Sequence, residues 1–92
     1  MQSAGQLVHG QLGSIGLTAL QLTATATHLN NGVRVKALAA NTHAVYVGLA
    51  GVTAGTGYQL SAGNDALFPV IDASTLYVIS AGTGDTVCFE GS

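Results

Sequence analysis

Charge is what this 92-residue sequence has least of. Charged residues make up 7% of the chain, against about 25% in an ordinary soluble domain, and only two are basic. Nucleic acids and anionic membranes both require several basic side chains, so neither is an expected partner. Apolar surface with so little charge usually ends in an interface, and we therefore expect an oligomer or an assembly subunit. A monomer coated with threonine and serine is the alternative.

Several other absences narrow the class of protein. A single cysteine, Cys88, excludes an internal disulfide, and we expect it to be a small buried hydrophobe. No apolar run approaches the roughly 18 residues of a membrane-spanning helix. Residues 1–5 lack the basic start and the apolar stretch of a secretory signal. A chain of this length is enough for one domain with a thin core.

Apolar and polar side chains alternate along several short segments. The clearest are residues 33–37 and 45–49, which are separated by the turn-forming break Asn41-Thr42-His43. Alternation with period two marks half-buried β-strands. Pro69 should place its strand at a sheet edge or a bulge, whereas the strand near residues 75–80 is apolar on both faces and should be central or interfacial. We expect further strands at residues 20–27, 58–60, 66–71 and 86–90.

Short strands at spacings of about 8–12 residues, without helical periodicity, predict an all-β fold. We expect a small antiparallel β-sandwich or barrel at residues 17–92, preceded by an extended N-terminal arm at residues 1–16. The arm is polar and glycine-rich apart from a few aliphatic side chains without an obvious core of their own. We expect these to contact a partner, with a disordered tail as the alternative: Leu7, Val8, Leu12 and Ile15.

No catalytic or ligand-binding motif is found in the sequence. Three histidines share no metal-ligand spacing, although copies from several subunits could meet on a symmetry axis: His9, His28 and His43. Three aspartates fall in predicted turns, where such residues usually bond to nearby backbone amides: Asp65, Asp72 and Asp85. The glycine-rich residues 48–57 lack the Gly-Lys-Ser/Thr ending of a phosphate loop. We therefore expect no enzyme, no cofactor and no metal site in the single chain.

Both basic side chains belong to the strand expected at residues 33–37. Arg34 and Lys36 are two residues apart on one face, so their side chains project side by side, about 7 Å apart. Parallel like charges are mildly unfavourable unless an acid meets them, and the domain has few acids. We expect both to meet carboxylates of a neighbouring subunit or partner. A solvated outer face is the alternative.

A set of strand and turn sequences carries a resemblance over residues 30–92: Gly32 to Thr42, Val45-Tyr46-Val47-Gly48, Gly51-Val52-Thr53, Thr56 to Leu60, Thr75 to Ile79 and Asp85 to Cys88. This set resembles the small structural proteins of tailed bacteriophages, which are often capsid decoration (cement) proteins. The resemblance implies a virion protein that is assembled in the host cytoplasm and binds the outer surface of the head. Its implied partners are the major capsid protein or another virion protein, and further copies of itself in a homo-oligomer, with a trimer suggested.

Two other functions stay open on the sequence. The chain could be a tail, neck or fibre-base component of the virion, which would differ from a decoration protein in copy number. It could also be a carbohydrate-binding β-sandwich, a class that uses aromatic platforms. The chain has no tryptophan, and its aromatic residues are few: Tyr46, Tyr58, Phe68, Tyr77 and Phe89.

Overall fold

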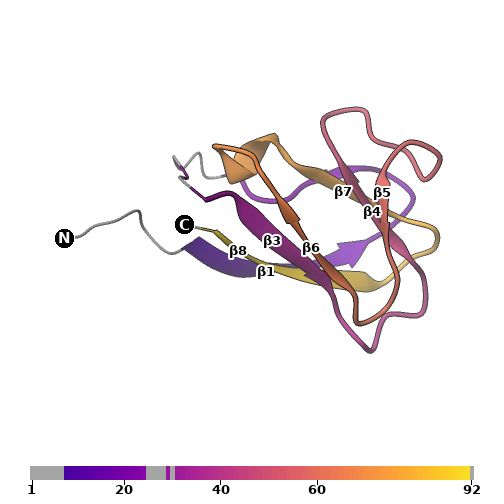
Figure 1. Cartoon of the computed structure of the whole chain (residues 1–92). Coiled ribbons are helices and arrows are strands. Elements are labelled where there is room, and N and C mark those ends of the chain that lie inside the picture. The colour runs from indigo at the N-terminus through magenta and orange to yellow at the C-terminus, as the bar shows by residue number, and fades with distance from the viewer. Residues whose placement is uncertain (1–7, 25–28, 30, 92) are drawn as a thin grey trace.

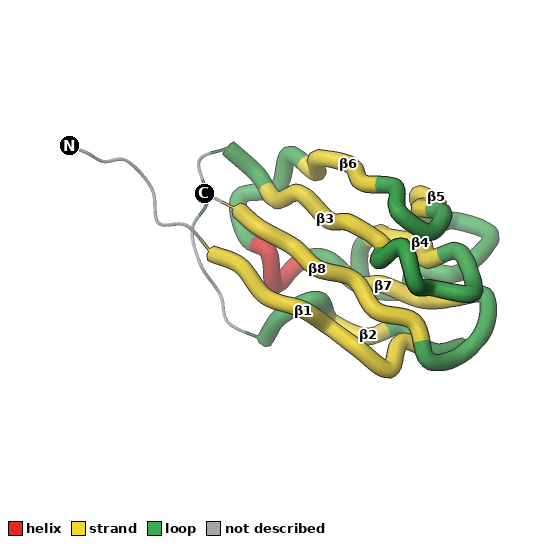
Figure 2. The backbone as a smooth tube through the Cα atoms, turned by 90° about the horizontal axis from the view of Figure 1, so that it is seen from below, coloured by secondary structure: helices red, strands yellow, loops and turns green. Residues whose placement is uncertain are grey.

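Two four-stranded antiparallel sheets pack face to face (Figures 1 and 2) in the computed structural model, which describes residues 8–24, 29 and 31–91. One sheet has the strand order β1-β8-β3-β6 and the other β2-β7-β4-β5. The strands are β1 (Val8–Ile15), β2 (Leu20–Gln21), β3 (Val33–Ala37), β4 (Val45–Gly48), β5 (Tyr58–Leu60), β6 (Asp65–Phe68), β7 (Tyr77–Ser80) and β8 (Asp85–Gly91). The predicted all-β antiparallel sandwich is confirmed.

The core lies between the two sheets and is built from alternate residues of the strands. In β3, Val33 and Val35 are fully buried, and in β4, Val45 and Val47 face them from the other sheet. The intervening residues of β3, Arg34 and Lys36, are exposed. The period-two pattern of the sequence therefore separates an apolar inner face from a charged outer face.

Strand β1 is the largest difference from the sequence prediction. Residues 8–15 were expected to belong to an arm, but they form a strand that pairs with β8 at residues 8–12 and again at Ile15. Ile15 is fully buried in the core, and Leu12 packs against it. The sandwich therefore begins at residue 8 and not at residue 17. The earlier part of the predicted arm, with Leu7, lies outside the described residues.

A β-bulge explains why the pattern of β1 was missed. The register with β8 shifts between Leu12 and Ile15, and Ser14 within this step has a positive φ of 57°. One extra residue moves Ile15 to the core face, which breaks the period-two alternation. Gly10 occupies another inward position and adds no apolar signal.

The other strands follow the predicted order, and several have different bounds. The strand expected at residues 20–27 is only two residues long as β2, and residues 25–28 lie outside the described part. β6 is an edge strand, as predicted, but it ends at Phe68, whereas the expected strand continued through Pro69 to residue 71. β7 is central in its sheet, also as predicted. It follows a 3-10 turn, η1 (Ala73–Thr75), where the Ser74 N–H donates to the Asp72 side chain.

Candidate partner-binding face

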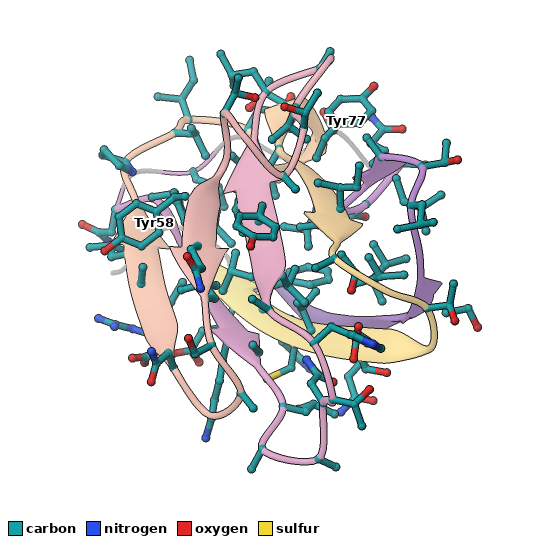
Figure 3. The ribbon with its side chains drawn as sticks, turned by 90° about the vertical axis from the view of Figure 1, so that its right-hand side faces the viewer. Tyr58 and Tyr77 are labelled. Carbon is teal, nitrogen blue, oxygen red and sulfur yellow. The ribbon has the colours of Figure 1, made fainter. Side chains whose placement is uncertain are left out.

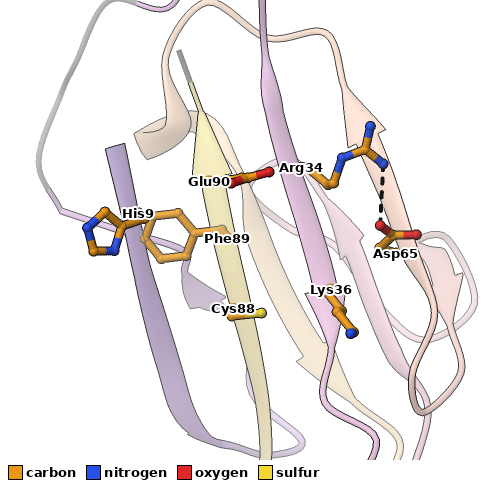
Figure 4. Close-up of a pocket in the computed structure, with 7 residues that line it drawn as sticks. All are labelled: His9, Arg34, Lys36, Asp65, Cys88, Phe89 and Glu90. Atoms are coloured by element: carbon orange, nitrogen blue, oxygen red, sulfur yellow. Dashed lines mark hydrogen bonds and ion pairs between the residues drawn. The ribbon is translucent and has the colours of Figure 1, made fainter. Parts of the chain in front are cut away.

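The outer face of the β1-β8-β3-β6 sheet carries a shallow pocket of about 300 Å³ (Figure 4). Arg34 lies opposite Glu90 of β8 in the register, and Lys36 lies opposite Asp65 of β6. His9 of β1 lies opposite Glu90 on its other side. Four strands therefore contribute polar side chains to one continuous surface, which we call the charged face. The lining residues are His9, Arg34, Lys36, Asp65, Cys88, Phe89 and Glu90.

Charge is concentrated on this face to an unusual degree. The chain has six charged residues, two basic and four acidic. Four of them line the pocket of the charged face: Arg34, Lys36, Asp65 and Glu90. The other two are carboxylates engaged within the domain. Asp72 caps η1, and Asp85 is buried. Electrostatic attraction to another molecule would therefore act mainly through the charged face.

Arg34 already has an acidic partner within its own sheet. Its Nη1 lies 3.3 Å from Oδ2 of Asp65, and both side chains are about half exposed, at 47% and 48%. Figure 4 shows this diagonal contact between β3 and β6. Exposed ion pairs of this kind contribute only about 0–1 kcal/mol to stability, so the pair can open for a partner at small cost. Within the described residues, Lys36 forms no ion pair.

Cys88 differs from its sequence expectation. It was expected to be a small buried hydrophobe, but it is half-buried on the charged face. The sheet register places Lys36 directly opposite Cys88. Cross-strand pairing, which the sequence around Cys88 does not reveal, therefore decides which side chain it meets.

The two predicted groups of contact residues lie on opposite sides of the sheet. Arg34 and Lys36 are exposed on the charged face, whereas Leu12 and Ile15 face the core. Ile15 is fully buried in its own domain and cannot serve as an anchor on a partner. Val8 is placed only through its backbone in β1, opposite Gly91.

His9, Asp65 and Glu90 belong to the charged face but were not singled out from the sequence as contact residues. These three residues are 25 or more positions apart along the chain, so only the sheet order brings them together. The one available signal was that Glu90 ends an alternating segment, on the polar side of the strand expected at residues 86–90.

A second polar cluster surrounds the buried carboxylate of Asp85, whose exposure is 1%. Its Oδ1 accepts the backbone N–H of Thr42 at 3.1 Å and that of His43 at 3.4 Å. Its Oδ2 lies 3.0 Å from Nδ1 of His43 and accepts the hydroxyl of Ser80. The Ser80 Oγ in turn accepts the N–H of Gly82. The carboxylate thus ties the β3–β4 connection to the β7–β8 turn.

The hydrogen bonds of this cluster set the ionisation of Asp85. Burial raises the pKa of a carboxyl group, but the donors on Ser80 and His43 and the backbone amides of Thr42 and His43 outweigh that effect. The pKa of Asp85 is therefore below its ordinary value of 3.8. The group remains charged at neutral pH and stabilises the connection that surrounds it.

Serine, histidine and aspartate occur together in this cluster, as they do in hydrolases, but their order differs. In a catalytic triad the serine hydroxyl bonds to the imidazole, and the imidazole bonds to the acid. Here the Ser80 hydroxyl donates to Asp85 and not to His43. The imidazole lies over Gly82, where an added Cβ would overlap its ring. The cluster has the geometry of a structural clamp.

The exposed Tyr58 and the half-buried Tyr77 do not share one platform. Tyr58 of β5 packs edge-to-face on Phe68 of β6, with ring centroids 5.8 Å apart. Tyr77 of β7 is separated from β5 by β4, and Figure 3 shows the two tyrosines on different parts of the molecule. This arrangement gives no support to the carbohydrate-binding alternative.

The described part of the chain shows neither a metal-binding cluster nor a membrane-spanning helix. Residues 8–24, 29 and 31–91 contain no group of three histidine, cysteine or acidic side chains arranged to hold a metal ion. Over the same residues, no helix has the length and apolar character to cross a membrane. In comparisons with known proteins, no family model, curated protein or solved structure matches this chain.

Proposed function

We propose that this chain is a structural protein of a tailed-phage virion, acting as a decoration (cement) protein on the outer surface of the head. The observation that carries the proposal is the charged face. A small β-sandwich with few charges holds both of its cations and two of its four acids on one open sheet face. A surface of this kind suits an oriented contact with another protein better than it suits a catalytic site.

The charged face could guide docking without binding strongly. It carries Arg34 and Lys36 beside Asp65 and Glu90, so its formal charges cancel. Mixed charges of this kind fix register and encounter rate more than they add affinity. The exposed Leu67 lies opposite Arg34 on β6 and offers apolar contact area. Many copies on a repeating lattice would then gain avidity from individually weak contacts.

Binding to shells that lack this chain tests the proposal. Purified protein would be mixed with empty phage heads and sedimented, and the bound fraction measured against concentration. We expect saturable binding that is weakened about tenfold by Lys36→Glu, because the reversed charge opposes a complementary surface. Gln59→Glu is the matched control, since Gln59 is exposed on β5 of the other sheet and the change adds one negative charge there. Absence of wild-type binding, or equal effects of the two variants, would contradict the proposal.

A further inference from the structure

The free edge of strand β1 presents backbone groups that no described strand satisfies. β1 is the first strand of its sheet and pairs only with β8 within the described residues. The N–H of Leu38 donates to the carbonyl of Thr86 at 3.2 Å, so alternate β8 residues from Thr86 onward point their backbone groups towards β3. The remaining β8 residues, including Phe89, point theirs towards β1.

This alternation fixes the direction of every backbone group in the regular part of β1. Gly10 is paired with Phe89, so the N–H and C=O of Gly10 are directed to β8. The same holds for Val8 and Leu12, which lie two positions to either side. His9 and Gln11 therefore turn their N–H and C=O groups outward, to the open edge.

The free edge of β1 has few of the features that usually protect an edge strand. Natural edges are kept short or carry lysine, proline or inward charges. The edge strand β6 begins with Asp65 and is followed by Pro69, and the edge strands β2 and β5 are two and three residues long. β1 is eight residues long, and its protection is confined to the bulge at Ser14. Residues 8–12 form a regular, uncharged edge.

We propose that this edge pairs with the β1 edge of a second copy of the chain, antiparallel and about a two-fold axis at Gly10. In this register His9 of each copy lies opposite Gln11 of the other. These are the two residues whose backbone groups point outward, so four inter-chain hydrogen bonds form across the axis.

The same register also suits Gly10, Val8 and Leu12, whose backbone groups are directed to β8. Gly10 meets its own copy at a non-hydrogen-bonded position, where Cα atoms approach to about 4.5 Å and side chains crowd. Glycine has no side chain to crowd there. Val8 lies opposite Leu12 of the other copy in this register, so the backbone pairing extends over residues 8–12 of both strands. The pairing ends where the bulge begins, after Leu12.

Such a pair would join two sandwiches through one continuous eight-stranded sheet. A two-fold axis perpendicular to that sheet places the charged faces of both copies on the same side. This edge pairing does not depend on a virion role. It gives a dimer and not the trimer that the family resemblance suggests, because an isologous edge contact closes at two copies.

Mass measurement of the full chain tests the pairing. In light scattering from micromolar to millimolar concentration, the average molecular mass should rise from 9.1 kDa, the mass of one chain, towards twice that value. Gln11→Pro removes an outward N–H, whereas Gln11→Ala keeps it, and proline is tolerated on edge strands. Two inter-chain hydrogen bonds are lost per dimer, so Gln11→Pro should weaken dimerisation by about tenfold or more. Gln11→Ala should leave it within about threefold.

Hydrogen exchange on the wild-type protein gives a reading that does not depend on any variant. The amides of His9 and Gln11 should become protected as concentration rises, whereas in the monomer they face solvent. A protein that stays monomeric at all concentrations overturns the proposal. A dimer in which the His9 and Gln11 amides exchange fast also overturns it, and so does a dimer that forms equally well with Gln11→Pro. Loss of the dimer on deletion of residues 2–7 would assign the contact to that segment and would also overturn it.

Discussion

Replacing Asp85 with alanine removes the acceptor on which four hydrogen bonds converge. These come from the backbone amides of Thr42 and His43, the His43 imidazole and the Ser80 hydroxyl. A buried donor left without a partner costs about 1–3 kcal/mol, and some of these donors can find water because His43 is partly exposed. We expect Asp85→Ala to lower the free energy of unfolding by about 3 kcal/mol.

That loss is a large part of the total stability of a domain this small. A 92-residue domain has a free energy of unfolding of roughly 5–14 kcal/mol. A loss of about 3 kcal/mol should lower the melting temperature by about 12–24 °C. Urea unfolding followed by far-ultraviolet circular dichroism measures the change, since the chain has no tryptophan for fluorescence.

Asp85→Asn removes the negative charge of the carboxylate and keeps the size and shape of the side chain. The amide oxygen can still accept from Thr42 and His43, so we expect a smaller loss of about 1–2 kcal/mol. The pKa of Asp85 is below 3.8 in the folded state, so the charge contributes stability above that pH. The contribution is lost as pH falls through the folded pKa. The gap between wild type and Asp85→Asn should therefore be constant near neutral pH and close in acid. An alanine variant within about 0.5 kcal/mol of wild type, the usual range of surface changes, would show that the Asp85 carboxylate does not stabilise the fold.

Three further predictions follow from the sheet and the clamp. Replacing both Arg34 and Lys36 with glutamine should slow attachment to a shell and weaken the salt dependence of the attachment rate, with the melting temperature nearly unchanged. An unchanged attachment rate would mean that the two side chains only face solvent. Deleting residues 2–14 should abolish the cooperative thermal transition, because it removes most of β1 from the sheet; a folded, native-like spectrum would contradict the assignment of β1. Gly82→Ala should displace the His43 ring and lower stability by about 1 kcal/mol, which unchanged His43 chemical shifts and unfolding would disprove.

Much of the sandwich could be predicted from alternation alone. The valines of β3 and β4 alternate without interruption, and the structure buries each of them. Strand β1 was missed because glycine and a bulge interrupt the same pattern. Period-two reasoning works where every inward position carries an apolar side chain, and it fails where the backbone adds a residue.

The polar contacts could not be predicted, because they join distant parts of the chain. Asp85 follows a glycine-rich turn and reads locally as a turn aspartate, yet its partners Thr42 and His43 are more than 40 residues away. The break Asn41-Thr42-His43 was correctly predicted as a connection between strands. Its side chains and amides also bond to the start of β8, which no local signal indicates.

The charged face depends in the same way on strand order. Arg34 and Asp65 are 31 residues apart and meet because β6 pairs with β3. The sequence established that Arg34 and Lys36 share a face, but it did not reveal the acids beside them. The expected contact of Arg34 and Lys36 with a partner stays a prediction. Asp65 of the same sheet would compete with a partner's carboxylate for Arg34.

Copy number in purified virus particles is the most direct test of the proposed function. Particles of the virus that encodes this chain would be separated on a stained gel, and the band of the chain quantified against the major capsid protein. A decoration protein predicts a copy number close to that of the major capsid protein, as expected for a component that covers the shell. A band at a small fraction of that amount would indicate a tail or neck part, and complete absence of the chain from particles would contradict a virion role.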